Sequence, residues 1–188
     1  MKRNDFIKTC AAGVCGCGVL GLLAKAGPRP KGGDGQTAAV LEGSAQMRSQ
    51  LEGARERFAQ LLAVMGEEID ETARGKILRR LGRECAQKYA PLFNAHRGDL
   101  DGFVARAKTA WLEKAEYDEK AGRLRVVGKP GPCYCPLVKT GRTPASFCAC
   151  TLGWQEAAFS TILGKPVTAE IEETVLGGGS RCSFRIHF

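Results

Sequence analysis

The stretch PVTAEIEETVLGGGSRCSFRIHF, residues 166–188, decides the fold class. Apolar and polar residues alternate on both sides of the Gly-rich GGGS at residues 177–180. A period of two is typical of a β-strand with one buried face, and glycines supply the backbone freedom that a turn needs. The stretch therefore predicts an antiparallel hairpin. The residues expected on its apolar face are Val167, Ala169, Ile171, Cys182, Phe184, Ile186 and Phe188.

Two further elements precede this hairpin. The stretch LGWQEAAFSTILG, residues 152–164, carries aromatic and aliphatic residues at helical spacing and ends in Gly164, a usual helix terminator. The stretch GRLRVVG, residues 122–128, alternates like a strand with Leu124 and Val126 on one face. A strand, a cysteine-rich segment, a short helix and the hairpin therefore follow one another.

The first half of the chain predicts helices instead. Apolar residues recur at three- and four-residue steps over residues 44–65, 69–89 and 99–116, and Pro91 is expected to stop the second pattern. The fold class is therefore α+β, with three N-terminal helices packed on a small antiparallel sheet. The cysteine-rich segment, a short helix and a C-terminal β-hairpin complete it.

The N-terminus has the composition of an export signal. The charged MKRNDFIK is followed by the small and apolar TCAAGVCGCGVLGLLAKAG, and then by the Pro- and Gly-rich GPRPKGGDG. Ala24 and Ala26 form an Ala-x-Ala site that places cleavage before Gly27. The stretch RNDFIK, which begins at Arg3, resembles the twin-arginine translocation motif, although Asn4 stands where the second arginine belongs.

We therefore expect an export signal over residues 1–26, a flexible linker over 27–43 and a single domain over 44–188. The mature protein is expected in the periplasm or outside the cell, with no stable membrane span. An uncleaved N-terminus that anchors the chain in the membrane is the alternative. Although the full chain has a formal net charge of +8, its Lys and Arg are interleaved with Glu and no base-stacking aromatics accompany them, so nucleic acid is not an expected partner.

The segment CYCPLVKTGRTPASFCAC, residues 133–150, contains two Cys-x-Cys pairs. Thiolates bind soft and borderline cations strongly, and four of them suit a tetrahedral shell. With one intervening residue, an extended chain sends both side chains of a pair to the same face. The candidate metal ligands are Cys133, Cys135, Cys148, Cys150 and Cys182.

Zinc is the expected ion, with an Fe–S cluster or copper as alternatives. Disulfides in an oxidising compartment, or free structural or redox-active thiols, are the other interpretations. Cys85 falls on the apolar stripe of the second helix and is expected to be a buried structural thiol. His96 and His187 have no helpful spacing and are left out of the metal shell.

The stretch CTLGWQEAAFSTILGKPVTAEIEETVLGGGSRCSF, residues 150–184, resembles the 4-vinyl-reductase or hydrocarbon-binding domain superfamily. The matching marks are a Gly-aromatic pair, the GKPV, a Glu-rich strand and a Gly-rich turn that delivers Cys182. The resemblance implies a zinc site beside a small-molecule pocket. By position its cysteines fall on Cys148 or Cys150 and on Cys182, whereas the middle one falls on Thr174, where the pattern is broken. The whole chain also resembles a group of exported, cysteine-rich bacterial proteins, some of which carry the name of an aminothiazoline-carboxylate hydrolase.

The same resemblance implies an apolar pocket between helices and sheet, lined by Phe103, Trp111, Trp154 and Phe159. Ordinary core packing is the competing interpretation for each of these four side chains. The predicted function is that of an exported metal-thiolate protein that binds a small apolar or aromatic molecule. The alternative is a redox or metal-dependent enzyme that uses the cysteines, with Glu170 or Glu172 as a candidate base. A homodimer is the one protein assembly that we expect.

Overall fold

The computed structural model describes residues 34–188, and describes side chains from Ser44 onward. The predicted export signal lies outside the described residues. None of the helices in the described part of the chain is long and apolar enough to cross a membrane. In chain order the elements are α1 (Asp34–Glu68), α2 (Glu71–Gln87), α3 (Ala90–Ala95), α4 (Leu100–Lys108), β1 (Leu112–Asp118), β2 (Arg123–Gly128), η1 (Ala145–Cys148), α5 (Ala149–Leu163), β3 (Thr168–Glu173), η2 (Val175–Gly177) and β4 (Ser183–His187).

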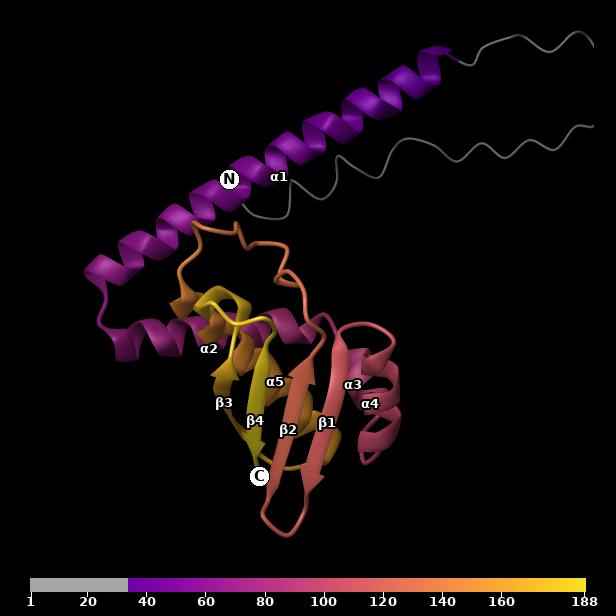
Figure 1. Cartoon of the computed structure of the whole chain (residues 1–188), viewed down its shortest axis with the longest axis vertical. Helices are drawn as coiled ribbons and strands as arrows, with labels where there is room; N and C mark the ends of the chain where they lie inside the picture. Colours follow the sequence, from indigo (N-terminus) through magenta and orange to yellow (C-terminus); the bar gives the residue numbers. More distant parts are fainter. Residues whose placement is uncertain (1–33) are drawn as a thin grey trace, which may run out of the picture. The chain divides into compact units, whose positions relative to one another are not determined.

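The strands form one antiparallel sheet in the order β1-β2-β4-β3 (Figure 1). The predicted hairpin is confirmed: Ala169 of β3 lies opposite Ile186 of β4, and Ile171 lies opposite Phe184. Ile171 is nevertheless 41% exposed, contrary to the expected burial. The sheet register shifts directly after Ile171 on this edge strand, so the alternation of the sequence does not carry through to burial there.

The third predicted helix begins as expected but ends earlier than predicted, and its second half is a strand. Asp99 caps α4 by accepting a hydrogen bond from Gly102 N at 2.9 Å, as expected, but α4 ends at Lys108 rather than near residue 116. Residues 112–118 are strand β1, paired with β2. The sequence LEKAEYD favours a helix locally. Pairing with β2 and the burial of Leu112 outweigh that preference.

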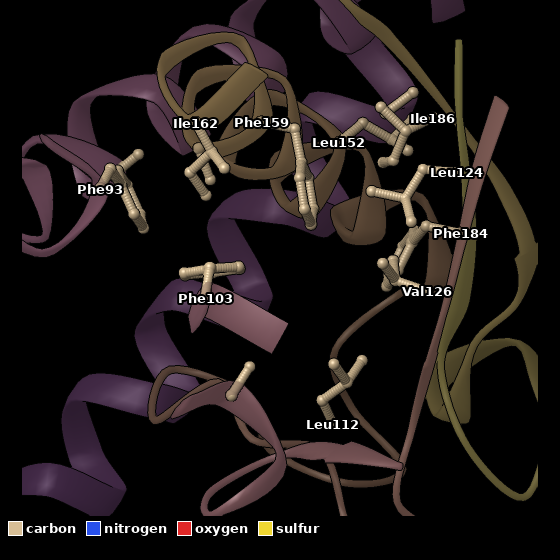
Figure 2. Packing of buried hydrophobic residues seen from close by; sticks show 14 residues of the cluster. Phe93, Phe103, Leu112, Leu124, Val126, Leu152, Phe159, Ile162, Phe184 and Ile186 are labelled. Atoms are coloured by element: carbon tan, nitrogen blue, oxygen red, sulfur yellow. The ribbon is translucent and has the colours of Figure 1, made fainter. Parts of the chain in front are cut away.

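The main core lies between the sheet and α5. Figure 2 shows Leu152 and Phe159 of α5 facing Leu124, Phe184 and Ile186 of the sheet. These side chains are fully or nearly fully buried. α3 and α4 close the same core with one phenylalanine each, and α5 ends as predicted at Gly164, whose φ of 68° is the left-handed conformation that glycine tolerates.

α2 packs on α5 through two glycines. A Cβ atom at Gly82 would stand 1.8 Å from the carbonyl oxygen of Cys150, and one at Gly153 would stand 1.9 Å from that of Arg79. Only glycine permits backbones to approach this closely. The two helices therefore cross with their backbones in contact, and residues that follow Gly82 on α2 are brought to the start of α5.

α1 packs on the cysteine segment, which we define as residues 133–150, and not on the sheet. Phe58 and Leu62 of α1 form a second buried cluster with Leu78, Val138 and Phe147. The exposed side chains on the predicted apolar stripe of α1 include Met47 and Leu61. α1 also begins at Asp34, so residues 34–43 are helical where we expected a flexible linker; TAAVLEG within them favours helix.

Candidate functional site: a cluster of cysteine thiols

Cys133 and Cys135 lie in the loop that follows β2. Both are half-buried against the second core cluster, whereas Tyr134 between them is 61% exposed. Both residues therefore contact the same cluster, whereas the side chain between them is exposed to solvent. A turn follows at once, in which Val138 N donates to the carbonyl of Cys135 at 3.1 Å.

The second pair differs from the expectation of extended backbone. Cys148 is the last residue of η1, and Cys150 is in the first turn of α5. Residues two apart on a helix point to different sides, so these two thiols cannot share a face. Cys148 hydrogen-bonds the Thr174 hydroxyl, whereas the backbone of Cys150 lies against Gly82 of α2.

Cys182 lies directly before β4, and the backbone N–H of Val175 in η2 hydrogen-bonds its sulfur. Thr174 caps η2 by accepting a hydrogen bond from Gly177 N at 3.1 Å and is itself buried. Thr174 stands where the resemblance expects a third cysteine ligand, and its side chain adjoins the Cys148 thiol. A threonine there supplies a hydroxyl to the sulfur where a cysteine would supply another thiol.

Cys85 of α2 belongs to the same site, although the sequence predicted a buried structural thiol. It is exposed, and it lies near enough to Cys135 and Cys150 to add to the rise in the pKa of both. Cys85 follows Gly82 by one helical turn, so the backbone contact between α2 and α5 carries it to the start of α5. No local sequence pattern identifies it, because its place depends on a contact between helices that are far apart in the chain. We call the six thiols together the thiol cluster: Cys85, Cys133, Cys135, Cys148, Cys150 and Cys182.

Burial raises the pKa of the inner thiols. It is the main cause of the rise in the pKa of Cys150 to about 12, with neighbouring thiols adding to it. Burial also raises the pKa of Cys135, Cys148 and Cys182. These four side chains are therefore neutral thiols near pH 7, which does not suit nucleophilic or redox chemistry that needs a free thiolate.

Each described cysteine is a free thiol. Among the described residues, no three His, Cys, Asp or Glu side chains stand together as a ready-made metal shell. The donor chemistry fits a soft metal, but an ion would have to draw these sulfurs together to form its shell. The two described histidines lie elsewhere: His96 packs on Phe103 with ring centroids 6.0 Å apart, and His187 Nε2 is 3.4 Å from Glu170 Oε2.

Ion pairs hold the cysteine segment against α1. Glu56 of α1 accepts from Lys139 Nζ at 2.8 Å and from Arg142 Nη2 at 2.7 Å. Hydrogen bonds from Lys139 and then from Arg142 lower the pKa of Glu56 to about 2. Arg55 Nε adds a hydrogen bond of 2.7 Å to the carbonyl of Pro136.

The four aromatic side chains predicted to line a pocket gather in one place. Phe103 and Phe159 are buried with centroids 5.7 Å apart, and the half-buried Trp111 and Trp154 have centroids 6.4 Å apart. Both pairs meet edge to face, a favoured packing of aromatic rings. Phe93 joins them through Phe103 and Trp154.

The hollows on the described surface include two that none of these four aromatics lines. One of about 320 Å³ lies beside Asp99, Tyr117 and Leu163. The other, of about 260 Å³, lies on the outer sheet face between acidic and arginine side chains. On that face Glu172 is bound by Arg125 and by Arg185, the latter at 2.6 Å, so it is a structural ion-pair partner and not a free base.

No protein-family model matches the chain, and a search of curated proteins finds no relative. Similar solved structures include the phenol-responsive sensory domain of the transcription activator PoxR with phenol, at 14% identity, with 71% of this chain and 73% of that chain covered and a TM-score of 0.46. They also include trafficking protein particle complex subunit 3 from Naegleria fowleri covalently bound to palmitic acid, at 12% identity, with 72% and 95% covered and a TM-score of 0.49. No conclusion about this chain follows from either likeness.

Proposed function

We propose that this protein binds a soft metal ion, zinc in the first instance, through its thiol cluster. The observation that supports the proposal is that free thiols from four separate parts of the chain lie near enough to one another to raise each other's pKa. Thiolates are the protein ligands that zinc prefers in structural sites, and Fe–S clusters and copper(I) use them as well.

A metal at this position would act on folding. The cysteine segment has little regular structure between β2 and η1, and α1, α2 and η2 surround it. Because the thiols would have to close on the ion and lose their protons, the binding free energy would add to the stability of this half of the domain. The cysteine thiolates would be the ligands, and the bound ion would link the cysteine segment to the elements around it.

The experiment is elemental analysis of purified protein, beside the double variant Cys148→Ser/Cys150→Ser. We expect bound zinc, iron or copper in the wild-type protein, and both a lower metal content and a melting temperature several degrees lower in the variant. Ser146→Ala is the matched control, because it changes an exposed side chain on η1 and keeps every thiol. Wild-type protein without metal, and as stable as the double variant, would reject the proposal.

We further propose that the domain binds a small apolar or aromatic molecule beside Trp111 and Trp154. These two rings are half-buried and meet edge to face, so a ligand would have to displace one of them. Naphthalene as a probe should then quench or shift tryptophan fluorescence in the wild-type protein and much less in Trp154→Leu. Equal, non-saturating responses in both proteins would count against a pocket here.

Export also remains a proposal. It is supported by the basic start, the apolar middle and the Ala24-x-Ala26 site of the leader. N-terminal sequencing of protein expressed in a bacterial host should find Gly27 at the start of an exported product. A membrane-bound product that keeps Met1 would instead favour the anchored alternative.

A further inference from the structure

Three arginines lie on the outer face of the sheet. Arg123 and Arg125 of β2 and Arg185 of β4 alternate with buried apolar residues along their strands, so their side chains point away from the core. Arg125 and Arg185 are direct register partners. Like charges opposite one another on neighbouring strands repel and lower the stability of a sheet. This pair of arginines therefore needs an anionic group beside it.

One carboxylate of the protein already bridges the two opposed arginines. Arg125 Nε donates to Glu172 Oε2, and Arg185 Nη2 donates to Glu172 Oε1 at 2.6 Å. Each oxygen of this carboxylate thus binds a different guanidinium group. The bridge shows that the spacing of the two arginines suits a group with two acceptor oxygens.

The hollow of about 260 Å³ on this face borders all three arginines. Its other lining residues are Glu116 and Asp118, and Glu172 is not among them. Three guanidinium groups therefore surround a space that the bridging carboxylate does not fill.

The two acidic side chains of the hollow are already bound. Glu116 Oε1 accepts from Lys114 Nζ at 2.8 Å, and its Oε2 accepts from Arg125 Nη1 at 3.1 Å. Asp118 Oδ1 accepts from the backbone N–H of Ala121 at 3.0 Å. These carboxylates therefore offer few free acceptors to a ligand.

The arginines, in contrast, keep unused donors. A guanidinium group carries five N–H bonds. Within the described residues, the contact of Arg123 with a carboxylate is Nη2 to Asp118 Oδ2 at 4.0 Å, which is too long for a hydrogen bond. In the same part of the chain, Arg185 uses only Nη2. The hollow thus has donors in excess and lacks an acceptor.

We propose that this hollow binds an oxyanion, namely the carboxylate or phosphate group of a small molecule, through Arg123, Arg125 and Arg185. The planar fork of a guanidinium group matches both kinds of oxyanion, and hydrogen bonds between charged partners are stronger than neutral ones. The bound oxyanion would act on the arginines as a second carboxylate beside Glu172. None of the lining residues is a cysteine, so this site does not depend on metal binding.

The test is an NMR titration of the full-length, nitrogen-15-labelled chain with sodium phosphate and, separately, with sodium succinate. The backbone N–H signals of β2 and β4 and the arginine Nε–H signals report binding, and sodium chloride at the same ionic strength is the reference. We expect saturable shifts that chloride does not produce. A response to phosphate alone supports a phosphate ligand, and a response to succinate alone supports a carboxylate ligand.

Arg123→Gln tests the site itself. Its side chain is 54% exposed and makes no hydrogen bond within the described residues, so the fold should persist while the dissociation constant rises about tenfold. Arg80→Gln is the matched control, because it removes the same charge from an exposed side chain of α2, and it should leave the titration unchanged.

Two results would overturn the oxyanion site. One is a wild-type response to both anions that is no larger than the response to chloride. The other is equal weakening in Arg123→Gln and Arg80→Gln, which would mean that the anions respond only to overall charge. The wild-type titration decides the proposal even if a variant fails to fold, and neither result bears on metal binding by the thiol cluster.

Discussion

Gly82 of α2 lies against the carbonyl oxygen of Cys150 in α5, where an added Cβ atom would stand only 1.8 Å from that oxygen. Gly153 of α5 makes the reciprocal approach to the carbonyl of Arg79. This crossing of two backbones fixes the spacing of the helices, and it places Cys85 at the edge of the thiol cluster. The Gly-aromatic pair of the sequence therefore has a packing role through its glycine.

Gly82→Ala should destabilise the domain, because the new methyl group overlaps a backbone atom that cannot move aside. Forced overpacking of this kind costs about 1–3 kcal/mol of unfolding free energy. Urea unfolding monitored by circular dichroism would measure it. Gly75→Ala is the matched control on the same helix: no atom lies within 4 Å of its Cβ position, so it should raise stability by about 0.5–1 kcal/mol. Equal effects of the two variants would show that the close crossing is absent.

Glu56 should make the attachment of the cysteine segment sensitive to acid. Lys139 and Arg142 lower the pKa of Glu56 from 4.5 to about 2, so its contribution to stability is complete above about pH 4.5 and is lost as the pH falls through 2. The melting temperature of the wild type should exceed that of Glu56→Gln at pH 6, and the difference should shrink towards pH 2. A difference that stays constant over that range would contradict the ion-pair account.

Thr174→Val should lower stability although it keeps the shape of the side chain. The buried hydroxyl accepts from Gly177 N and hydrogen-bonds the Cys148 sulfur. Gly177 N keeps its bond of 3.0 Å to the backbone carbonyl of Thr174, so the loss of the hydroxyl falls mainly on Cys148 and costs about 1 kcal/mol. Thermal unfolding would measure the change. Thr174→Ser keeps the hydroxyl and should retain most of the stability; a serine variant as unstable as the valine variant would point to methyl packing instead.

The C-terminal half of the fold could be predicted from sequence because its signals are local. Alternation around a Gly-rich turn gives the β3–β4 hairpin, and Gly164 marks the end of α5. β1 could not be found in this way, since only Leu112 of that edge strand is buried and its Glu, Lys and Ala residues favour a helix. Its pairing with β2 is a tertiary effect.

The candidate site was predicted in part for a similar reason. Cys-x-Cys spacing agrees with the packing of Cys133 and Cys135 against one cluster, but it misleads at Cys148 and Cys150, where the chain has already become helical. Cys85 occupies an apolar stripe in the sequence, yet it is exposed in the structure. Its place depends on the close approach of Gly82 to Cys150 and of Gly153 to Arg79, which no local pattern reveals.

X-ray absorption at the metal edge of the purified protein tests the central claim most directly, since it reports which atoms surround a bound ion. Metal-thiolate binding predicts a shell of four sulfur atoms, at about 2.3 Å if the metal is zinc. A shell made only of oxygen and nitrogen, or protein without metal, would show that the cysteines do not gather for an ion.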